Sequence, residues 1–317
     1  MGADTLVPVP KADPPTAVSW VRFSVSKANL GSLGPYRLLN VVHTGHASQI
    51  WQAYDDAQGC FVAVKTPLER FRRDREHLGY LKREYLVGSR LIHDRILRVL
   101  KFGNDRGIPY LAMEWFVGGT MKARLRQGLD MLLPWVPKIV VQAAEAVAYL
   151  NGQGWVHRDV KPDNFLVGDN GDVKLIDFAL AQRKCGVLGR WLTRPRSKVQ
   201  GTRSYIASEQ IRGMPLDDRA DLYSLGCTLF ELIAGKPPYT GTSTQDLLNK
   251  HLKGPVPALD NVDPNVAPEF AQLIRWSMQK DPAARPRSSE EFFRKVSQTP
   301  VFRRGWPYAG AAKGAGY

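Results

Sequence analysis

The feature of this 317-residue sequence that most constrains its fold is a change of hydrophobic periodicity at the adjacent glycines Gly118 and Gly119. Before this pair, the apolar and β-branched runs YRLLNVV, QIWQAYD and CFVAVKT are separated by turn signals, with DAQG between the last two. After it, helical periodicity dominates to about Val296. The pattern predicts an α+β fold with a small antiparallel β lobe and a larger helical lobe.

One main helix is predicted within the small lobe, in the segment LERFRRDREHLGYLKREYLVGSRLIH. Leu81, Tyr85, Gly88 and Ile92 fall on one face of this helix and form its predicted buried stripe. Glu84 lies beside that stripe. Carboxylates are seldom buried without a partner, so this acid needs an explanation beyond packing.

The predicted domain covers residues 35–297, with the small lobe at about 35–114 and the large lobe at about 117–297. Residues 1–34 are rich in Pro, Ala and Ser and are predicted to form a flexible leader, although VSWVRFSV alternates and could add an edge strand. Residues 298–317 are predicted to form a basic tail rich in Gly and Ala.

Composition and charge argue against several classes of protein. The net charge of +14 favours an acidic partner, but no nucleic-acid recognition motif accompanies it, and no nucleic acid is expected. The longest apolar segment, MLLPWVPKIVVQAAEAVAYL, is interrupted by prolines and charged residues, which predicts a soluble helix and no membrane span. The three cysteines form no CxxC pair, which argues against a disulfide framework and a zinc site. Without a secretory signal pattern, the expected location is cytoplasmic.

Several motifs in chain order resemble those of the protein kinase family: VAVK, HRDVKPDNFL, KLIDFA, GTRSYIASEQ and DLYSLG. The resemblance covers roughly Tyr36 to Val296. Within the family, the sequence is similar to the eukaryotic-type serine/threonine kinases of bacteria. It implies a two-lobed protein-kinase-like fold. It also implies transfer of a phosphoryl group from ATP to serine or threonine residues of protein substrates, with Mg²⁺ or alternatively Mn²⁺.

The resemblance assigns catalytic roles to four residues. Asp159 would accept or orient the proton of the attacking hydroxyl, and Lys161 would steady the γ-phosphate. Lys65 would bind the α- and β-phosphates and pair with Glu84, which would account for a carboxylate beside a buried stripe. Lysine at position 161 is similar to the serine/threonine kinases and unlike the tyrosine kinases.

The resemblance also implies the groups that hold the nucleotide and its metal. Asn164 and Asp177 would be the magnesium ligands. Met113 would precede the linker between the lobes, and the backbone from Glu114 to Phe116 would contact adenine. The other predicted nucleotide contacts are His43, Gly45, Ser48, Ile50, Ala63 and Lys65.

Two structural matches accompany these roles. Glu209 resembles the acid that pairs with a distant arginine, for which Arg285 is the candidate. Asp221 resembles the buried helix acid that binds the backbone of the catalytic loop.

The sequence departs from the family pattern at several positions. His43 and Ser48 stand where the phosphate-binding loop GxGxxG has its first and third glycines, which predicts weaker or altered nucleotide contacts. Ala179 replaces the glycine of DFG, which would narrow the range of activation-loop states, and Ser208 replaces the proline of APE. Gly88 replaces a bulky apolar residue and is expected to leave a packing gap.

The segment between Asp177 and Glu209 is strongly basic and contains no acid. Its cations are Arg183, Lys184, Arg190, Arg194, Arg196, Lys198 and Arg203. Such a cluster is expected to need an anion, supplied by phosphorylation of Ser197 or Thr193 or by a substrate with Asp or Glu near the acceptor residue.

The resulting hypothesis is a serine/threonine protein kinase, slow or regulated because its phosphate loop is degenerate. The main alternative is a pseudokinase that acts as a nucleotide-binding scaffold or switch. Two further alternatives, a kinase of small molecules or lipids and a basic nucleic-acid-binding protein, have less support. The substrate-platform motifs GTRSYIASEQ and DLYSLG oppose the first, and charge alone supports the second.

Overall fold

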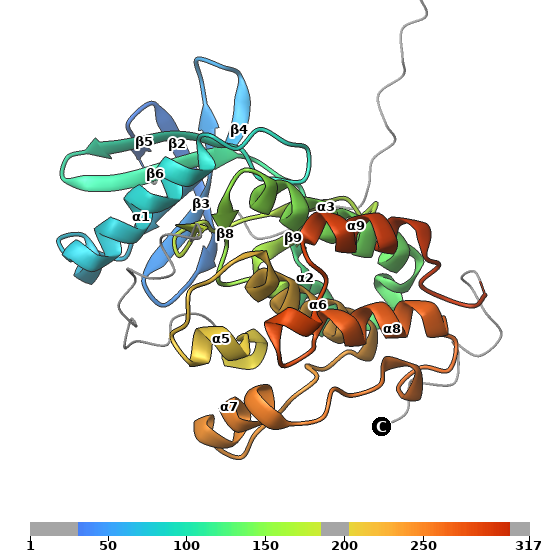
Figure 1. Cartoon of the computed structure of the whole chain (residues 1–317). Helices are drawn as coiled ribbons and strands as arrows, with labels where there is room; N and C mark the ends of the chain where they lie inside the picture. Colours follow the sequence, from blue (N-terminus) through green and yellow to red (C-terminus); the bar gives the residue numbers. More distant parts are fainter. Residues whose placement is uncertain (1–30, 185–202, 305–317) are drawn as a thin grey trace, which may run out of the picture.

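A computed structural model describes residues 31–184 and 203–304 of the chain. It confirms the predicted α+β fold with two lobes, a small one built on an antiparallel sheet and a larger helical one (Figure 1). The sheet of the small lobe has the strand order β1-β2-β3-β4-β6-β5. Its strands are β1 (Ser32–Leu33), β2 (Tyr36–Thr44), β3 (Ser48–Asp55), β4 (Cys60–Pro67), β5 (Val99–Asp105) and β6 (Ile108–Glu114).

The three strands predicted first pair as antiparallel neighbours, β2 with β3 and β3 with β4. Gly59 ends the turn between β3 and β4 with a φ of 66°, a backbone conformation that glycine adopts without a steric penalty. Strand β1 pairs with β2 and buries Leu33, within residues that the sequence analysis assigned to the leader. The segment VSWVRFSV lies outside the described residues.

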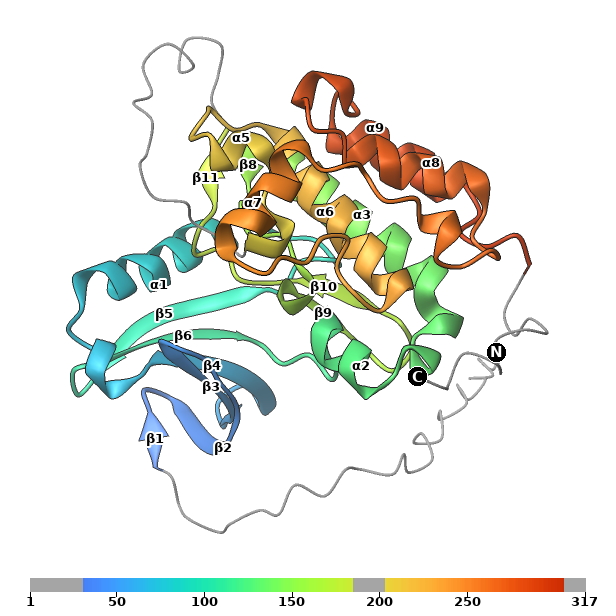
Figure 2. The ribbon, with the colours of Figure 1, turned by 90° about the horizontal axis from the view of Figure 1, so that it is seen from below.

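Helix α1 (Arg75–Gly88) lies against one side of this sheet (Figure 2). It begins where the Asp74 side chain accepts a hydrogen bond from the His77 backbone N–H, as an N-cap residue does. Leu81 is buried, as predicted. The prediction for Ile92 was wrong: the helix ends at Gly88, and Ile92 lies beyond it with 75% of its surface exposed.

The expected packing gap beside Gly88 is also not present. A Cβ atom at this position would lie 2.4 Å from Cγ2 of Val99 and 3.1 Å from Cδ2 of Phe178. Val99 begins β5, and Phe178 follows Asp177, so these two side chains fill the volume that a larger helix residue would occupy. Gly88 is therefore a site of close approach, and as the last residue of the helix it interrupts no helical turn.

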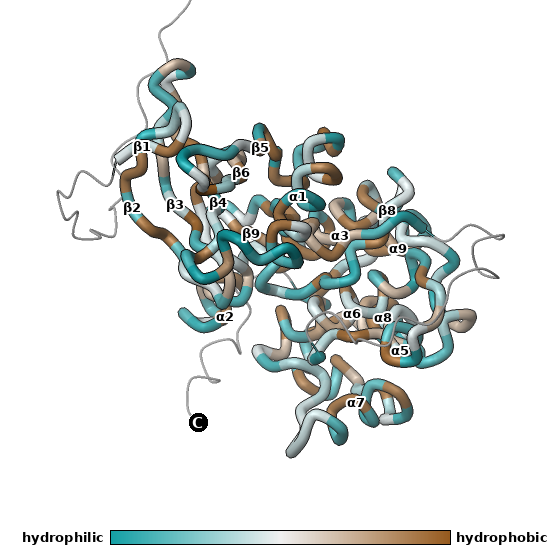
Figure 3. Tube along the Cα trace, turned by 90° about the vertical axis from the view of Figure 1, so that its left-hand side faces the viewer, coloured by the Kyte–Doolittle hydropathy of each residue, from teal (hydrophilic) through white to brown (hydrophobic). Residues whose placement is uncertain are grey.

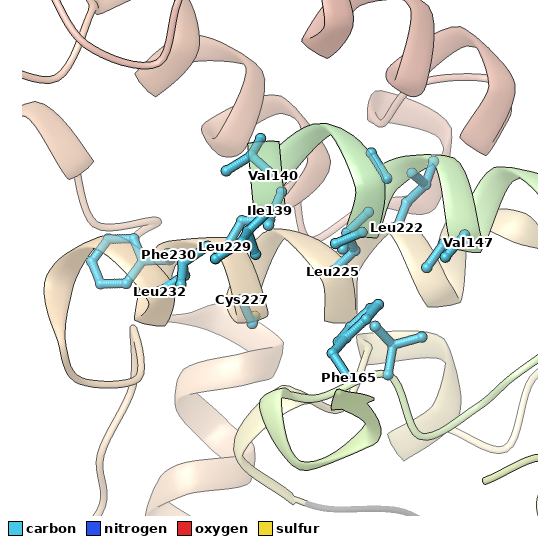
Figure 4. Packing of buried hydrophobic residues seen from close by; sticks show 14 of the residues in the cluster. Ile139, Val140, Val147, Phe165, Leu222, Leu225, Cys227, Leu229, Phe230 and Leu232 are labelled. Carbon is cyan, nitrogen blue, oxygen red and sulfur yellow. The ribbon is translucent and has the colours of Figure 1, made fainter. Parts of the chain in front are cut away.

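The larger lobe is built around helices α3 and α6, which pack against each other through apolar side chains such as Ile139, Val147, Leu225 and Leu229 (Figure 4). Hydrophobic stretches of the chain gather around α3, and hydrophilic stretches follow the outer loops (Figure 3). Pro137 stands in the first turn of α3, where its missing N–H costs no helical hydrogen bond. The helices described in this lobe are α2 (Met121–Gln127), α3 (Val136–Gly152), α5 (Ser208–Ile211), α6 (Asp218–Ala234), α7 (Thr244–Lys253), α8 (Pro268–Ser277) and α9 (Ser289–Gln298).

Short strands and a 3₁₀ turn position the loops between the lobes. One small sheet joins β7 to β9 and β10, and another joins β8 to β11. The turn η4 (Pro162–Asn164) lies between β8 and β9. The short strands are β7 (Gly119–Thr120), β8 (Trp155–Val156), β9 (Phe165–Val167), β10 (Val173–Leu175) and β11 (Gln182–Arg183). The loops after β8 and after β10 therefore start from fixed points, and both carry predicted site residues.

Candidate active site

The loop after β8, which is the catalytic loop of the kinase motif HRDVKPDNFL, is held in place by Asp221 of helix α6. Its fully buried carboxylate accepts hydrogen bonds from the backbone N–H of His157 at 2.7 Å and from that of Arg158 at 2.9 Å. Asn151 adds a third donor at 2.8 Å. Burial raises the pKa of Asp221, against the effect of these donors. The predicted contact between this acid and the catalytic loop is confirmed.

The carboxylate of Asp159 is surrounded by polar groups of its own loop. Oδ2 accepts from Lys161 Nζ at 2.6 Å and from Asn164 Nδ2 at 3.2 Å. The same Nδ2 donates to the backbone carbonyl of Asp159 at 2.7 Å. Two cationic or amide donors thus fix the orientation of one carboxylate oxygen.

Lys65, Glu84 and Asp177 come together from three separate elements. Lys65 on β4 donates to Glu84 on α1 at 2.6 Å, which confirms the predicted pair, and its Nζ lies 3.7 Å from Oδ1 of Asp177. Burial acts to lower the pKa of Lys65, but the carboxylates of Asp177 and Glu84 outweigh it and raise this pKa. The lysine is therefore a permanent cation between two lobes.

Asp177 follows β10 with a φ of 65°, in the left-handed region that residues with a side chain rarely adopt. Its Oδ1 accepts from the Ala179 backbone N–H at 3.3 Å. Burial acts to raise the pKa of Asp177, but Lys65 and then His157 outweigh it, and the net pKa is lowered. Phe178, next in the chain, is buried beside His157 and Gly88, which anchors the strained residue.

Asn164 and Asp177 fit a magnesium site of the kind that nucleotides bring with them. The amide nitrogen of Asn164 is bound to Asp159, so its Oδ1 is the atom left for a metal. The side chain of Asp177 is 38% exposed beside Lys65. Mg²⁺ prefers one or two protein oxygens together with phosphate oxygens and water, which these two side chains can supply. The described residues contain no cluster of three or more His, Cys, Asp or Glu side chains suited to a metal ion.

The predicted phosphate loop is the hairpin tip between β2 and β3. Gly45 donates its N–H to the Ser48 carbonyl at 2.8 Å, and His43 pairs with Ile50 in the strand register. Neither His43 nor Ser48 has a positive φ, so the two missing glycines do not prevent this hairpin from forming.

The tip of the hairpin is also tied to the segment that follows β4. The backbone N–H of Leu68 donates to the Ala47 carbonyl at 2.9 Å, and Arg70 donates to the His46 carbonyl at 3.0 Å. A phosphate loop attached in this way has less freedom to move than one connected through its glycines alone.

The predicted adenine contacts form one apolar group. Ala63 and Met113 are buried partners on adjacent strands, and Ile50 and Phe116 pack against the same cluster. The Glu114 carboxylate points elsewhere: it accepts from Lys174 Nζ at 2.6 Å and from the Arg98 backbone N–H at 2.9 Å. Any contribution of Glu114 to adenine would therefore come from its backbone, as predicted.

The segment between Asp177 and Glu209, called the activation segment below, has its C-terminal end fixed to the core of the large lobe. Glu209 and Arg285 form the predicted pair, with N–O distances of 2.7 and 3.0 Å, and both side chains are buried. Ser208 adds a bond from its hydroxyl to the Lys280 carbonyl at 2.6 Å. The proline that Ser208 replaces has no donor, so the serine gains an anchor to the core.

Another buried carboxylate, not predicted from the sequence, lies next to Glu209's segment. Glu231 of α6 accepts from the Tyr205 hydroxyl at 2.5 Å and from Lys122 of α2. The signal was available, because Glu231 interrupts the apolar run CTLFELIAG in the middle of a helix.

The activation-segment phosphosite candidates, Ser197 and Thr193, lie outside the described residues. The three described cations of the basic segment have partners on other elements. Lys184 binds Asp218 of α6 at 2.5 Å, Arg183 stacks on Trp155 at 4.2 Å from the ring centroid, and Arg203 donates to a threonine hydroxyl of α7. The expected mutual repulsion is therefore relieved at both ends of the segment, by groups that the local sequence does not contain.

A profile of the protein kinase domain family matches residues 36–302, most of the chain. The chain belongs to the protein kinase family. This kinase is 33% identical over 262 residues to a probable serine/threonine-protein kinase of Streptomyces coelicolor, covering 81% of its own length and 39% of that protein. It is also 33% identical over 276 residues to the serine/threonine-protein kinase PknA of Mycobacterium tuberculosis, covering 86% and 62%.

The kinase thus spans less than two thirds of the length of these two curated relatives. Among solved structures, it is similar to the PknI kinase domain of Mycobacterium tuberculosis with a TM-score of 0.63 and 23% identity, covering 86% of this chain and 98% of that one. This likeness confirms the two-lobed kinase fold. In the part of the chain that the structure describes, no helix combines the length and apolar character needed to cross a membrane.

Proposed function

We propose that this kinase domain transfers the γ-phosphoryl group of ATP to serine or threonine hydroxyls of proteins. The observation that carries the proposal is the convergence of Asp159, Asn164, Asp177 and the Lys65–Glu84 pair at one place between the lobes. Phosphoryl transfer depends mainly on positioning and on electrostatic stabilisation, and these charges supply both. The names of the curated relatives support serine/threonine protein substrates.

The residues divide the work by their positions. Asp159 would orient the incoming hydroxyl and take up its proton, because one of its oxygens is fixed by Lys161 and Asn164. Lys161 would remain beside the transferred group as its charge shifts. Lys65, held in place by Glu84, would position the α- and β-phosphates. ATP would supply the phosphoryl group, and Asn164 and Asp177 would hold the Mg²⁺ or Mn²⁺ that shields its charge.

A pseudokinase is the second candidate function. The side chains at positions 43 and 48 favour it, because they keep the loop backbone from approaching phosphates as closely as glycines would. The complete set of charged site residues opposes it. We therefore propose a slow or regulated enzyme, with the domain boundaries at residues 35 and 297 and a cytoplasmic location kept as predictions.

Turnover of ATP with Mg²⁺ or Mn²⁺ separates the two candidates. The wild-type chain should phosphorylate itself or a general protein substrate, and Asp159→Asn should lower kcat by about 10²–10⁴-fold because proton transfer and hydroxyl positioning are lost. Asp130→Asn, at an exposed acid on a surface turn, is the matched control and should keep full activity. Nucleotide binding without turnover in the wild type would support the pseudokinase.

We further propose that acidic residues flank the acceptor in the substrate. The other cations of the segment, which lie outside the described residues, are Arg190, Arg194, Arg196 and Lys198. An acidic peptide or a phosphate on Ser197 or Thr193 would complement their charge. A peptide library should show preference for acidic sequences, and the preference should shrink as salt is raised. Selection of basic peptides would contradict this substrate class.

A further inference from the structure

Arg158, the residue that precedes Asp159, is held in an unfavourable backbone conformation. Arg158 has a φ of 73°, in the left-handed region that a residue with a Cβ atom rarely adopts. Such a conformation persists only where neighbouring groups hold the backbone on several sides. The orientation of Asp159 depends on the backbone conformation of Arg158, because this conformation sets the direction in which the chain enters Asp159.

Hydrogen bonds hold this part of the backbone at successive groups. The N–H of Arg158 donates to Asp221 at 2.9 Å. The carbonyl of Arg158 accepts from Nε2 of Gln210 at 3.0 Å. The N–H of Asp159 donates to Nδ1 of His157 at 3.3 Å. Gln210 therefore holds the oxygen of the same peptide whose nitrogen belongs to Asp159.

Gln210 reaches the catalytic loop from the short helix α5, Ser208–Ile211. Its Oε1 accepts from the backbone N–H of Ala207 at 3.1 Å, so both ends of the amide are bound and the group cannot flip without losing both bonds. The helix is anchored by the two residues that precede Gln210, since Ser208 binds the Lys280 carbonyl and Glu209 binds Arg285. The Gln210 amide is thus a fixed hydrogen-bonded link between the end of the activation segment and the catalytic loop.

We propose that Gln210 is a positioning residue for the phosphotransfer reaction, which acts by holding the Arg158–Asp159 peptide in its strained orientation. Its donor bond sets where the Asp159 carboxylate points, and it links that orientation to the seating of α5. This inference rests on the proposed kinase function. It adds an uncharged residue, whose side chain binds the backbone of Arg158 and Ala207, to the charged groups described above.

Gln210→Glu separates the positioning role from a purely local one. Glutamate keeps an oxygen that accepts from Ala207, so the cap of α5 survives, but it cannot donate to the Arg158 carbonyl while ionised. We expect kcat to fall about 10- to 100-fold through misplacement of Asp159, with KM for ATP changed less than twofold. The ratio of variant to wild-type kcat should recover as the pH is lowered, because a protonated carboxyl can donate.

Amide hydrogen exchange of the nucleotide-free chain provides a readout that needs no activity. Exchange at residues 157–160 should be faster in Gln210→Glu than in the wild type. Gln279→Glu is the control, because the Gln279 side chain also donates to a backbone carbonyl, that of Arg275 in α8. Gln210→Met, which lacks donor and acceptor alike, should resemble Gln210→Glu.

The outcomes decide the matter. A wild-type kinase whose kcat and exchange pattern are both unchanged by Gln210→Glu and Gln210→Met would overturn the positioning role. Faster exchange with lost kcat and a thermal midpoint within a few degrees of the wild type would establish it. An inactive wild type would refute the proposed function. Hydrogen exchange would still test whether the Gln210 hydrogen bond holds the backbone of the catalytic loop.

Discussion

At the scale of single residues, the site depends on charges that act on one another: burial raises the pKa of Glu84 to about 7, and the Lys65 cation acts to lower it. Lys65 is a cation because Glu84 and Asp177 surround it, and Glu84 is tolerated in a buried position because Lys65 donates to it at 2.6 Å. The lysine and the helix acid are thus a single functional unit. Removing either charge should affect catalysis more than packing.

Replacement of Glu84 by glutamine tests this unit. The amide keeps the volume of the side chain but removes its charge, so Lys65 should shift toward Asp177, which lies 3.7 Å away. We expect kcat/KM to fall at least 10-fold, and the thermal midpoint to change by only a few degrees. Glu76→Gln on the same helix, at an exposed acid bonded to Tyr80, should leave the kinetics unchanged. Equal kinetics for the two variants would show that the ion pair is dispensable.

At the scale of elements, helix α1 meets the large lobe and β5 at Gly88, where packing is tight. Substituting alanine in a helix normally stabilises it, by about 1 kcal/mol relative to glycine. At Gly88 the new Cβ would lie 2.4 Å from Val99, so overpacking opposes that gain. The site therefore offers a direct test of whether the glycine leaves a gap.

Gly88→Ala should lower the free energy of unfolding by about 1–3 kcal/mol, measured by denaturant titration. Gly79→Ala is the control within the same helix, because a Cβ there has no neighbour within 4 Å, and it should stabilise the protein. Adding Val99→Ala to Gly88→Ala should recover part of the loss. Stabilisation by Gly88→Ala would instead restore the idea of an empty space beside α1.

Some contacts of the site could be predicted from the sequence, and others could not. The pairs Lys65–Glu84 and Glu209–Arg285 were predictable because the resemblance to the kinase family implies both partners of each pair. The contact of Gly88 with Val99 was not, because a residue on another element fills the space. Gln210 was missed for a related reason: a side-chain amide has no charge to balance, so nothing in its sequence context announces a partner.

The phosphate hairpin between β2 and β3 yields the next prediction. His43→Gly together with Ser48→Gly should lower KM for ATP, because a backbone without these side chains can approach the phosphates more closely. Thermal stability should fall slightly, since glycine costs conformational entropy in a strand. Gln58→Gly in the opposite turn is the control and should leave KM for ATP unchanged. A KM for ATP that stays the same or rises in the double variant would mean that the two side chains contribute to the site.

At the scale of the whole molecule, the activation-segment end, α6, α7 and the loop after α8 meet at a buried polar cluster. Fully buried His251 lies with its Nδ1 2.9 Å from the Tyr223 hydroxyl, and Lys280 donates to Tyr223 and Tyr239 at 3.2 and 2.9 Å. Burial, with a further effect of the Lys280 charge, lowers the pKa of His251 from 6.5 to about 4. The cluster thus couples the seating of several helices to the protonation of one imidazole.

The direction of the resulting pH dependence follows from linkage. Between pH 6.5 and about 4 the unfolded chain binds a proton at His251 and the folded chain does not, so the free energy of unfolding falls as the pH is lowered through this window. The stabilisation is fully present above pH 6.5 and amounts to about 3 kcal/mol from this shift.

His251→Asn keeps a polar atom near the Nδ1 position and removes the titration. Denaturant titrations at pH 7.5, 6, 5 and 4 should therefore show a shallower loss of stability in this variant than in the wild type. The same replacement at exposed His46 controls for the loss of a histidine as such. Parallel curves for wild type and His251→Asn across the window would show that the buried imidazole does not govern acid unfolding, and would leave the acidic side chains as its cause.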